Sequence, residues 1–157
     1  MYSIDTSALM DWQARFYPLD VFRALEVRIE ALIAEDQCCA VHLVSDELAA
    51  VGTPDLQAWA KSHRHLFVPL TSDIQMSGAE IERNYPDLMD PKGLHESADA
   101  YIIALARLRD GIVVSQETSV AEKRNPKKKH FIPDVCRDLG VPCINLLGLM
   151  RREKWVF

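Results

Sequence analysis

Short apolar runs alternate with longer amphipathic segments along the chain. The compact apolar runs 39–44 (CAVHLV), 111–115 (GIVVS) and 141–146 (VPCINL) are typical of buried strands, as are the shorter runs 1–4 and 67–70. Between them, apolar residues recur at helical spacing, most clearly over 20–35, which predicts a helix with one buried face. The residues that set this spacing are Val21, Phe22, Leu25, Ile29, Leu32 and Ile33.

Capping residues predict several further helices. Thr53-Pro54 is an N-cap followed by proline at the first helical position, so we expect a helix from there to 59. A strongly apolar helix begins at Ser97 and stops at Gly111, in the position that usually follows a helix C-terminus. Another helix is predicted over 133–140, and a short basic helix closes the chain.

Strands separated by helices are typical of βαβ units with right-handed crossovers. The sequence therefore predicts an α/β fold, a three-layer α/β/α sandwich with a mostly parallel central sheet. The segment 87–93 (DLMDPKG) predicts a loop. Because no internal repeat or linker divides the chain, we expect a single domain over 1–157.

The composition is that of an ordinary globular domain. The 157 residues are 48% hydrophobic and 26% charged, which excludes a disordered tail or a fibrous repeat. The longest apolar run, 100–106, is far shorter than the ~20 residues that cross a bilayer. The N-terminal segment MYSIDTSALM has no basic stretch ahead of an apolar core. We therefore expect a cytoplasmic protein with no secretory signal and no membrane partner.

The four cysteines are spaced in a way that disfavours a structural zinc site. Cys38 and Cys39 are adjacent, six residues separate Cys136 from Cys143, and no CxxC motif occurs. Tetrahedral zinc sites need paired ligands at short turn spacing. We expect reduced thiols that are mostly buried.

Positive charge is concentrated in one segment. The chain carries a net charge of −5, yet the segment 123–130 (KRNPKKKH) holds five Lys and Arg residues, so the remainder carries −10. A general nucleic-acid coat protein is excluded by this balance. The segment fits either a local contact to a phosphate backbone or a solvated surface loop.

Four acidic residues stand where an open parallel sheet binds its ligands, near the carboxyl ends of strands. Asp5 ends the first strand, and Glu47 lies just past the second, at the expected start of a helix. Asp99 is in the first turn of the apolar helix, and Glu117 follows the strand GIVVS. We expect these four side chains to meet in one cleft.

Carboxylates gathered in one cleft raise each other's pKa values and disfavour the compact state. A hard divalent cation such as Mg²⁺ or Mn²⁺ removes that penalty and prefers oxygen ligands, and it can assist attack on a phosphodiester. Each acid also has a purely structural explanation. Asp99 would complement its helix dipole, and Glu117 would be an ordinary exposed loop acid.

The order of these motifs resembles a PIN domain, in particular the VapC-type toxins and their relatives. The resemblance rests on IDTSAL after the opening strand, DEL after the second, the SADAYIIALA helix and VVSQE followed by a basic stretch. It continues into IPDVCRDLGVPCINL and so covers essentially the whole chain. It implies a PIN-like sandwich in which Asp5, Glu47, Asp99 and Glu117 are catalytic and bind Mg²⁺ or Mn²⁺.

The resemblance also implies small polar residues beside the first and fourth acids. Ser7 and Thr6 match the first position, and Ser115 or Thr118 matches the second. The fourth acid, often aspartate in PIN domains, is glutamate here. Candidates for holding RNA phosphates are Arg15, Arg23, Lys123, Arg124, Lys127, Lys128 and Lys129.

The aromatic residues Trp12, Phe16 and Tyr17 offer a further alternative. They either stack on unpaired bases or pack against the helix over 20–35 or a subunit partner, and packing is the stronger interpretation.

The leading hypothesis is a metal-dependent endoribonuclease, the toxin of a toxin–antitoxin pair, with RNA as substrate and a cognate antitoxin and a second copy as partners. The alternative is a non-catalytic PIN-like scaffold that binds RNA or protein. A third class, the haloacid-type phosphatases, also uses an aspartate after strand one. Those enzymes carry a second aspartate two positions on, where this chain has Ser7.

Overall fold

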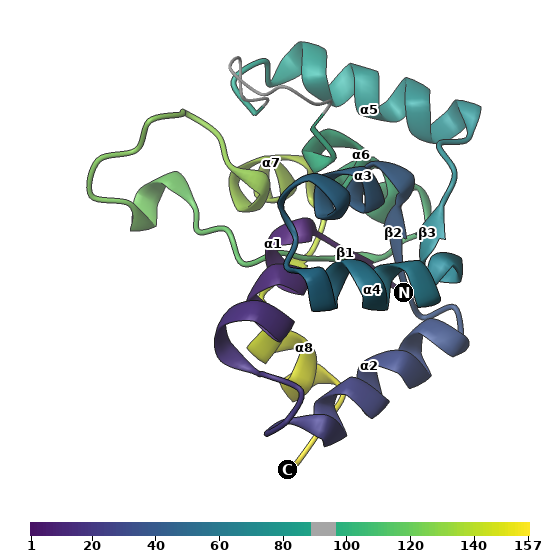
Figure 1. Ribbon diagram of the computed structural model, residues 1–157. Coiled ribbons are helices and arrows are strands. Elements are labelled where there is room, and N and C mark those ends of the chain that lie inside the picture. The colour runs from purple at the N-terminus through teal and green to yellow at the C-terminus, as the bar shows by residue number, and fades with distance from the viewer. Residues whose placement is uncertain (89–96) are drawn as a thin grey trace.

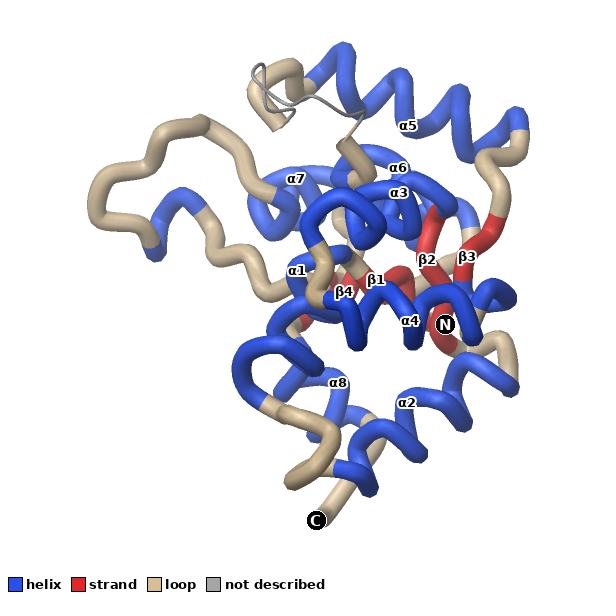
Figure 2. The backbone as a smooth tube through the Cα atoms, viewed as in Figure 1, coloured by secondary structure: helices blue, strands red, loops and turns tan. Residues whose placement is uncertain are grey.

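A five-stranded parallel sheet forms the centre of the molecule (Figures 1 and 2). The computed structural model describes residues 1–88 and 97–157. The strand order is β3-β2-β1-β4-β5, and each neighbouring pair is parallel. The strands are β1 (Tyr2–Ile4), β2 (Cys38–Val41), β3 (Phe67–Val68), β4 (Ile112–Val114) and β5 (Cys143–Ile144).

Helices cover both faces of this sheet, which confirms the predicted three-layer α/β/α sandwich. They are α1 (Thr6–Met10), α2 (Arg23–Ala34), α3 (His42–Val51), α4 (Pro54–Ser62), α5 (Ser72–Asn84), α6 (Asp99–Leu108), α7 (Ile132–Leu139) and α8 (Leu146–Arg152). A π-helical segment η1 (Asp11–Phe16) extends α1, and the 3₁₀ turns are η2 (Arg64–Leu66) and η3 (Val120–Glu122). In Figure 1, α5, α6 and α7 lie above the sheet, and α2 and α8 lie below it.

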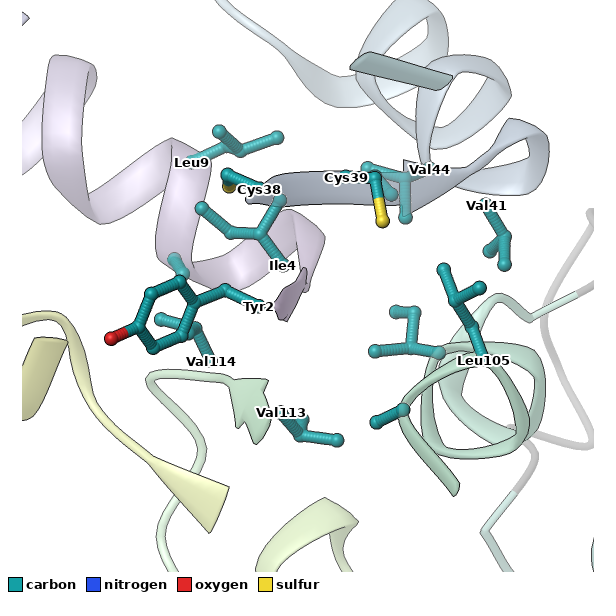
Figure 3. Packing of buried hydrophobic residues seen from close by; sticks show 14 of the residues in the cluster. Tyr2, Ile4, Leu9, Cys38, Cys39, Val41, Val44, Leu105, Val113 and Val114 are labelled. Atoms are coloured by element: carbon teal, nitrogen blue, oxygen red, sulfur yellow. The ribbon is translucent and has the colours of Figure 1, made fainter. Parts of the chain in front are cut away.

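The core forms where α6 crosses the three central strands. Figure 3 shows Leu105 of α6 on the side of the sheet that also presents Val41 and Val113, while Ile4 and Leu9 pack on the other side. All five side chains are buried. Strands buried on both faces explain why these segments read as continuous apolar runs.

The predicted strand over 39–44 is wrong at its end. β2 stops at Val41, and α3 begins at His42. Leu43, Val44 and Leu48 are buried along one face of α3, so the apolar run CAVHLV contains both a strand and the first turn of a helix. A short apolar run does not distinguish the two by periodicity. Glu47 consequently lies in the second turn of α3, later than predicted.

Other boundaries differ by a few residues. β3 ends before Pro69, which has no N–H for a sheet hydrogen bond. The helix predicted to start at Ser97 begins at Asp99, whose N–H donates to the Ser97 hydroxyl (3.3 Å). After α6 the left-handed residue is Asp110, with φ of 47°, and not Gly111. Of the loop predicted over 87–93, residues 89–93 lie outside the described residues.

Two predicted helix caps and the predicted burial of most thiols are confirmed. Thr53 caps α4 by accepting a hydrogen bond from the Leu56 N–H (3.3 Å), and Gly140 ends α7 with φ of 69°. Three of the four thiols are buried, and Cys143 is half-buried. In residues 1–88 and 97–157, no helix combines the length and apolar character needed to cross a membrane.

Candidate functional site

Asp5 is the central residue of the candidate site. It follows β1 directly, and its N–H donates to the Val114 carbonyl at the end of the neighbouring strand β4 (2.9 Å). Its side chain is only 3% exposed. The carboxyl ends of β1 and β4 therefore bring the residues that follow each strand together, as the sequence predicts.

Two serines hold the Asp5 carboxylate in place. Its Oδ2 accepts hydrogen bonds from the Ser7 hydroxyl, from the Ser7 N–H (3.2 Å) and from the Ser115 hydroxyl (3.0 Å). The two hydroxyl oxygens are 3.3 Å apart. Ser115 is therefore the second small polar residue of the cluster. Thr118, the other candidate for that position, is exposed.

Glu47 ties α3 to two other parts of the site. One carboxylate oxygen accepts a hydrogen bond from the Thr6 hydroxyl at the start of α1. The other accepts from the Ala98 N–H (2.9 Å), which directly precedes Asp99 and the start of α6. This pair of contacts fixes the first turn of α6, with Asp99, beside α1 and α3.

Glu117 closes the remaining side. Its N–H donates to the Ser115 hydroxyl (3.1 Å), and its Oε2 accepts from the Ile132 N–H at the start of α7 (3.0 Å). The hydroxyl of Ser115 thus bridges the segments of Asp5 and Glu117. Hydrogen bonds thus join the segments of Asp5, Glu47 and Glu117 around the carboxyl ends of β1 and β4, and Asp99, next to Ala98, is close enough to feel the charges of all three.

Burial and mutual repulsion dominate the electrostatics of this network. Burial raises the pKa of Asp5, although hydrogen bonds from Ser7 and Ser115 partly oppose the rise. The pKa of Asp99 is raised well above its usual value, first by burial and then by the negative charges of the other three acids. Burial also raises the pKa of Glu117. The cluster therefore resists full ionisation.

The donor chemistry of the cluster fits a hard divalent cation. All four side chains offer carboxylate oxygens, which Mg²⁺ and Mn²⁺ prefer, and a cation would lower the repulsion that raises these pKa values. Within the two described ranges, no group of three or more His, Cys, Asp or Glu side chains stands in an arrangement that could hold a metal ion, so binding would require these carboxylates to reorient. Glu47 and Glu117 each use carboxylate oxygens for the hydrogen bonds described above.

Two residues next to the cluster, Gln116 and Asp11, were not predicted from the sequence. The Gln116 N–H donates to the Ser7 hydroxyl (3.0 Å), and its side-chain oxygen accepts from the Leu146 N–H (2.8 Å). Its side-chain nitrogen donates to Asp11 (3.3 Å), a buried acid in η1. Ser7 and Asp11 are four residues apart and so share one face of a helix. This spacing could have indicated from the sequence that Asp11 lies near the site.

Arg15, a predicted phosphate contact, belongs to this chain of residues. Its guanidinium donates to Asp11 (2.7 Å) while its side chain remains 60% exposed. Asp11 and Gln116 thus hold an exposed positive charge at one border of the cluster. Arg23, the other predicted arginine contact, is exposed at the start of α2.

The basic segment divides into two groups. Lys123 and Lys128 are half-buried, and their ammonium groups lie 4.2 and 5.5 Å from the centre of the Phe131 ring. Both partly oppose the rise in the pKa of Glu117 that burial causes, and Lys128 also opposes the rise for Asp99. The three other basic residues, Arg124, Lys127 and Lys129, have exposed side chains.

The aromatic residues after β1 mostly pack in the interior. Trp12 is fully buried and meets the ring of Trp59 edge-on, with centroids 4.9 Å apart. Tyr17 meets Phe22 in the same manner at 5.3 Å. Tyr17 thus packs against a residue of the segment predicted as the first helix, whereas the ring contact of Trp12 is with α4. Phe16 is 59% exposed.

Comparisons with known proteins agree with the fold. A family model described as a domain of unknown function (DUF4411) matches residues 2–157. The crystal structure of FitAcB from Neisseria gonorrhoeae is similar, with a TM-score of 0.52 at 18% identity, over 92% of this chain and 97% of that one. No curated protein matches this sequence. At such low identity the likeness establishes the fold alone, and it agrees with the predicted PIN-like sandwich.

Proposed function

The chain belongs to the family described as a domain of unknown function, DUF4411, and we propose that it is a metal-dependent endoribonuclease with a PIN-like active site. One observation carries the proposal. Four segments far apart in the sequence bring Asp5, Glu47, Asp99 and Glu117 together, and burial and the neighbouring acids raise the pKa values of Asp5, Asp99 and Glu117. An ordinary structural role for each acid does not explain why they interact.

The acids and the serines of the cluster would have different roles in phosphodiester hydrolysis. The acids would hold Mg²⁺ or Mn²⁺, which supplies Lewis-acid stabilisation of the charge that develops on the phosphate. Ser7 and Ser115 orient the Asp5 carboxylate by hydrogen bonds. Such support from surrounding hydroxyls keeps an ionic site in one geometry.

Basic residues on two borders of the cluster would bind the RNA backbone. Arg15 projects from one border, held by Asp11, and Lys123 and Lys128 lie at another, over Phe131. Positive side chains position a nucleic acid through its phosphates. The more exposed Arg124, Lys127 and Lys129 would add weaker, longer-range attraction.

The proposal is tested by Mn²⁺-dependent cleavage of RNA with Asp5→Asn and Asp99→Asn. We expect each to lower cleavage by at least 100-fold. The matched control is Asp46→Asn, since Asp46 is exposed on α3 next to Glu47 and contacts only His42 (3.5 Å) among the described residues. Cleavage by both Asp5→Asn and Asp99→Asn at the rate of the control would overturn the proposal.

We further propose that the enzyme is the toxin of a toxin–antitoxin pair and acts as a homodimer. Induced expression of the wild type should arrest growth, Asp5→Asn should not, and co-expression of the cognate antitoxin should restore growth. Arrest by both proteins would contradict a nuclease toxin. Sedimentation of the purified chain measures its oligomeric state.

A non-catalytic scaffold remains the second candidate, favoured by the hydrogen bonds that already occupy Glu47 and Glu117. Calorimetric titration with Mn²⁺ separates the two functions. Heat that disappears in Asp5→Asn supports the enzyme. RNA binding that is unchanged in Asp5→Asn, without heat from Mn²⁺, supports the scaffold.

A further inference from the structure

A second site lies on the other side of α3. A cavity of about 400 Å³ opens between α3, α4 and the segment that leads into β3. Its volume falls within the ~300–1,000 Å³ that small-molecule sites occupy. The lining residues on α3 are His42, Ser45, Leu48 and Ala49.

Helix geometry separates this cavity from the acidic cluster. His42, Ser45 and Ala49 are spaced three and four residues apart, so they share one face of α3. Glu47 is two residues from both Ser45 and Ala49, about 200° around the helix at ~100° per residue, and so projects from the opposite face. A ligand in the cavity therefore does not occupy the site of the four carboxylates.

The rim of the cavity is positively charged. Lys61 at the end of α4 and Arg64 in η2 both line it, and both side chains are exposed. Neither makes an ion pair with any residue in the part of the chain that the structure describes. The third basic group, His42, lies 3.5 Å from Asp46, the nearby carboxylate on the solvent side.

The floor of the cavity is apolar, with hydrogen-bonding groups at its wall. Leu48 and Ala60 are buried there, and the ring of Phe67 is half-buried. The Gln57 side chain is fixed because its nitrogen donates to the carbonyls of Ala49 (3.0 Å) and Gly52 (3.1 Å). Its oxygen accepts no hydrogen bond from the described residues and can accept one from a ligand.

We propose that this cavity binds a mononucleotide. Lys61 and Arg64 would hold its phosphate, as cationic side chains do when they lack a carboxylate partner. The base would lie against the apolar floor and Phe67, with Ser45 and Gln57 as polar contacts. A pocket with an apolar wall and a few converging polar groups is typical of a small-molecule site. The proposal is independent of nuclease activity.

The test is calorimetric titration of the purified chain with 5′-AMP in the presence of EDTA, which prevents binding through a divalent cation at the acids. We expect saturable 1:1 binding, and at least tenfold weaker binding of adenosine and of inorganic phosphate. The double variant Lys61→Ala/Arg64→Ala should weaken 5′-AMP binding at least tenfold. Ala49→Trp, which fills the cavity without changing its charge, should do the same.

Two controls separate this site from the others. Asp5→Asn should bind 5′-AMP as the wild type does, because the acids lie across α3. Arg83→Ala, which removes an exposed charge at the end of α5, should also bind normally. The proposal is overturned if 5′-AMP does not bind, if the double variant binds as tightly as the wild type, or if phosphate alone binds as tightly as 5′-AMP.

Discussion

The two ends of α6 affect the stability of the fold in opposite directions. The first turn carries Asp99, whose pKa is raised well above its usual value by burial and by the negative charges of Asp5, Glu117 and Glu47. The later turns carry only apolar residues toward the sheet, among them Ile102, Ile103 and Leu105, all fully buried. The acids at the first end therefore destabilise the folded state, and the apolar contacts of the other end offset that cost. The candidate site and the stabilising core contacts thus lie on different turns of one helix.

Removing packing from the later turns should have the largest effect. Leu105→Ala leaves a cavity between α6 and the strands that carry Val41 and Val113, so we expect a loss of about 2–5 kcal/mol in the free energy of unfolding. Urea denaturation measures it. Leu108→Ala, in the same helix but 45% exposed, is the control and should change stability by less than about 0.5 kcal/mol. Equal losses would mean that α6 does not form the core.

A smaller effect is expected from the positive charges beside the acids. Lys128 is half-buried over Phe131, and its ammonium donates to the Leu88 carbonyl (2.9 Å). Its positive charge also opposes the rise in the pKa of Asp99. Lys128→Ala should lower RNA cleavage about tenfold, equivalent to roughly 1.4 kcal/mol. Lys127→Ala, one residue away and exposed, should lower it less than twofold. Equal effects would mean that the segment acts only through its total charge.

The acids at the strand ends are the part of the candidate site that the sequence predicts well. Asp5 and Glu117 follow apolar runs, so a local pattern and the strand-end rule suffice to propose them. Glu47 is found by the same rule, but its position in α3 is misjudged because CAVHLV contains both a strand and a helical turn.

Partners far apart in the sequence are harder to predict. Gln116 contacts Asp11, 105 residues away, because α1 and η1 pack beside the segment after β4. Nothing local to either residue indicates this pairing. The division of the basic segment likewise depends on which lysines reach the ring of Phe131, a tertiary contact. Local patterns therefore predict the acids, and tertiary packing determines the residues that surround them.

Relieving the repulsion in the first turn should stabilise the protein. Without divalent cations, Asp99→Asn removes a buried charge that faces three acids, so we expect the melting temperature at neutral pH to rise by about 2–4 °C, or roughly 1 kcal/mol. Differential scanning fluorimetry in EDTA measures this rise. In Mn²⁺ the order should reverse, because the wild type gains a bound ion that the variant holds less well. A variant less stable than the wild type in EDTA would show that Asp99 supports the fold.

The smallest expected effect is the pH dependence of the difference in melting temperature between Asp99→Asn and the wild type. It tests whether the charge of Asp99 causes that difference. Because folding raises the pKa of Asp99 above its usual 3.8, the folded protein holds this proton more tightly than the unfolded chain does. The stability is fully present below the unfolded pKa and is lost as the pH rises through the folded value. Without cations, the advantage of Asp99→Asn should therefore be lower at pH 4 than at pH 7.5 by about 1–2 °C, a fraction of 1 kcal/mol. Subtracting the variant's melting temperature from that of the wild type at each pH cancels most contributions from acids such as Asp73, whose pKa is lowered by a hydrogen bond from Thr71. A difference that stays constant with pH would attribute the gain to packing of the amide and not to charge.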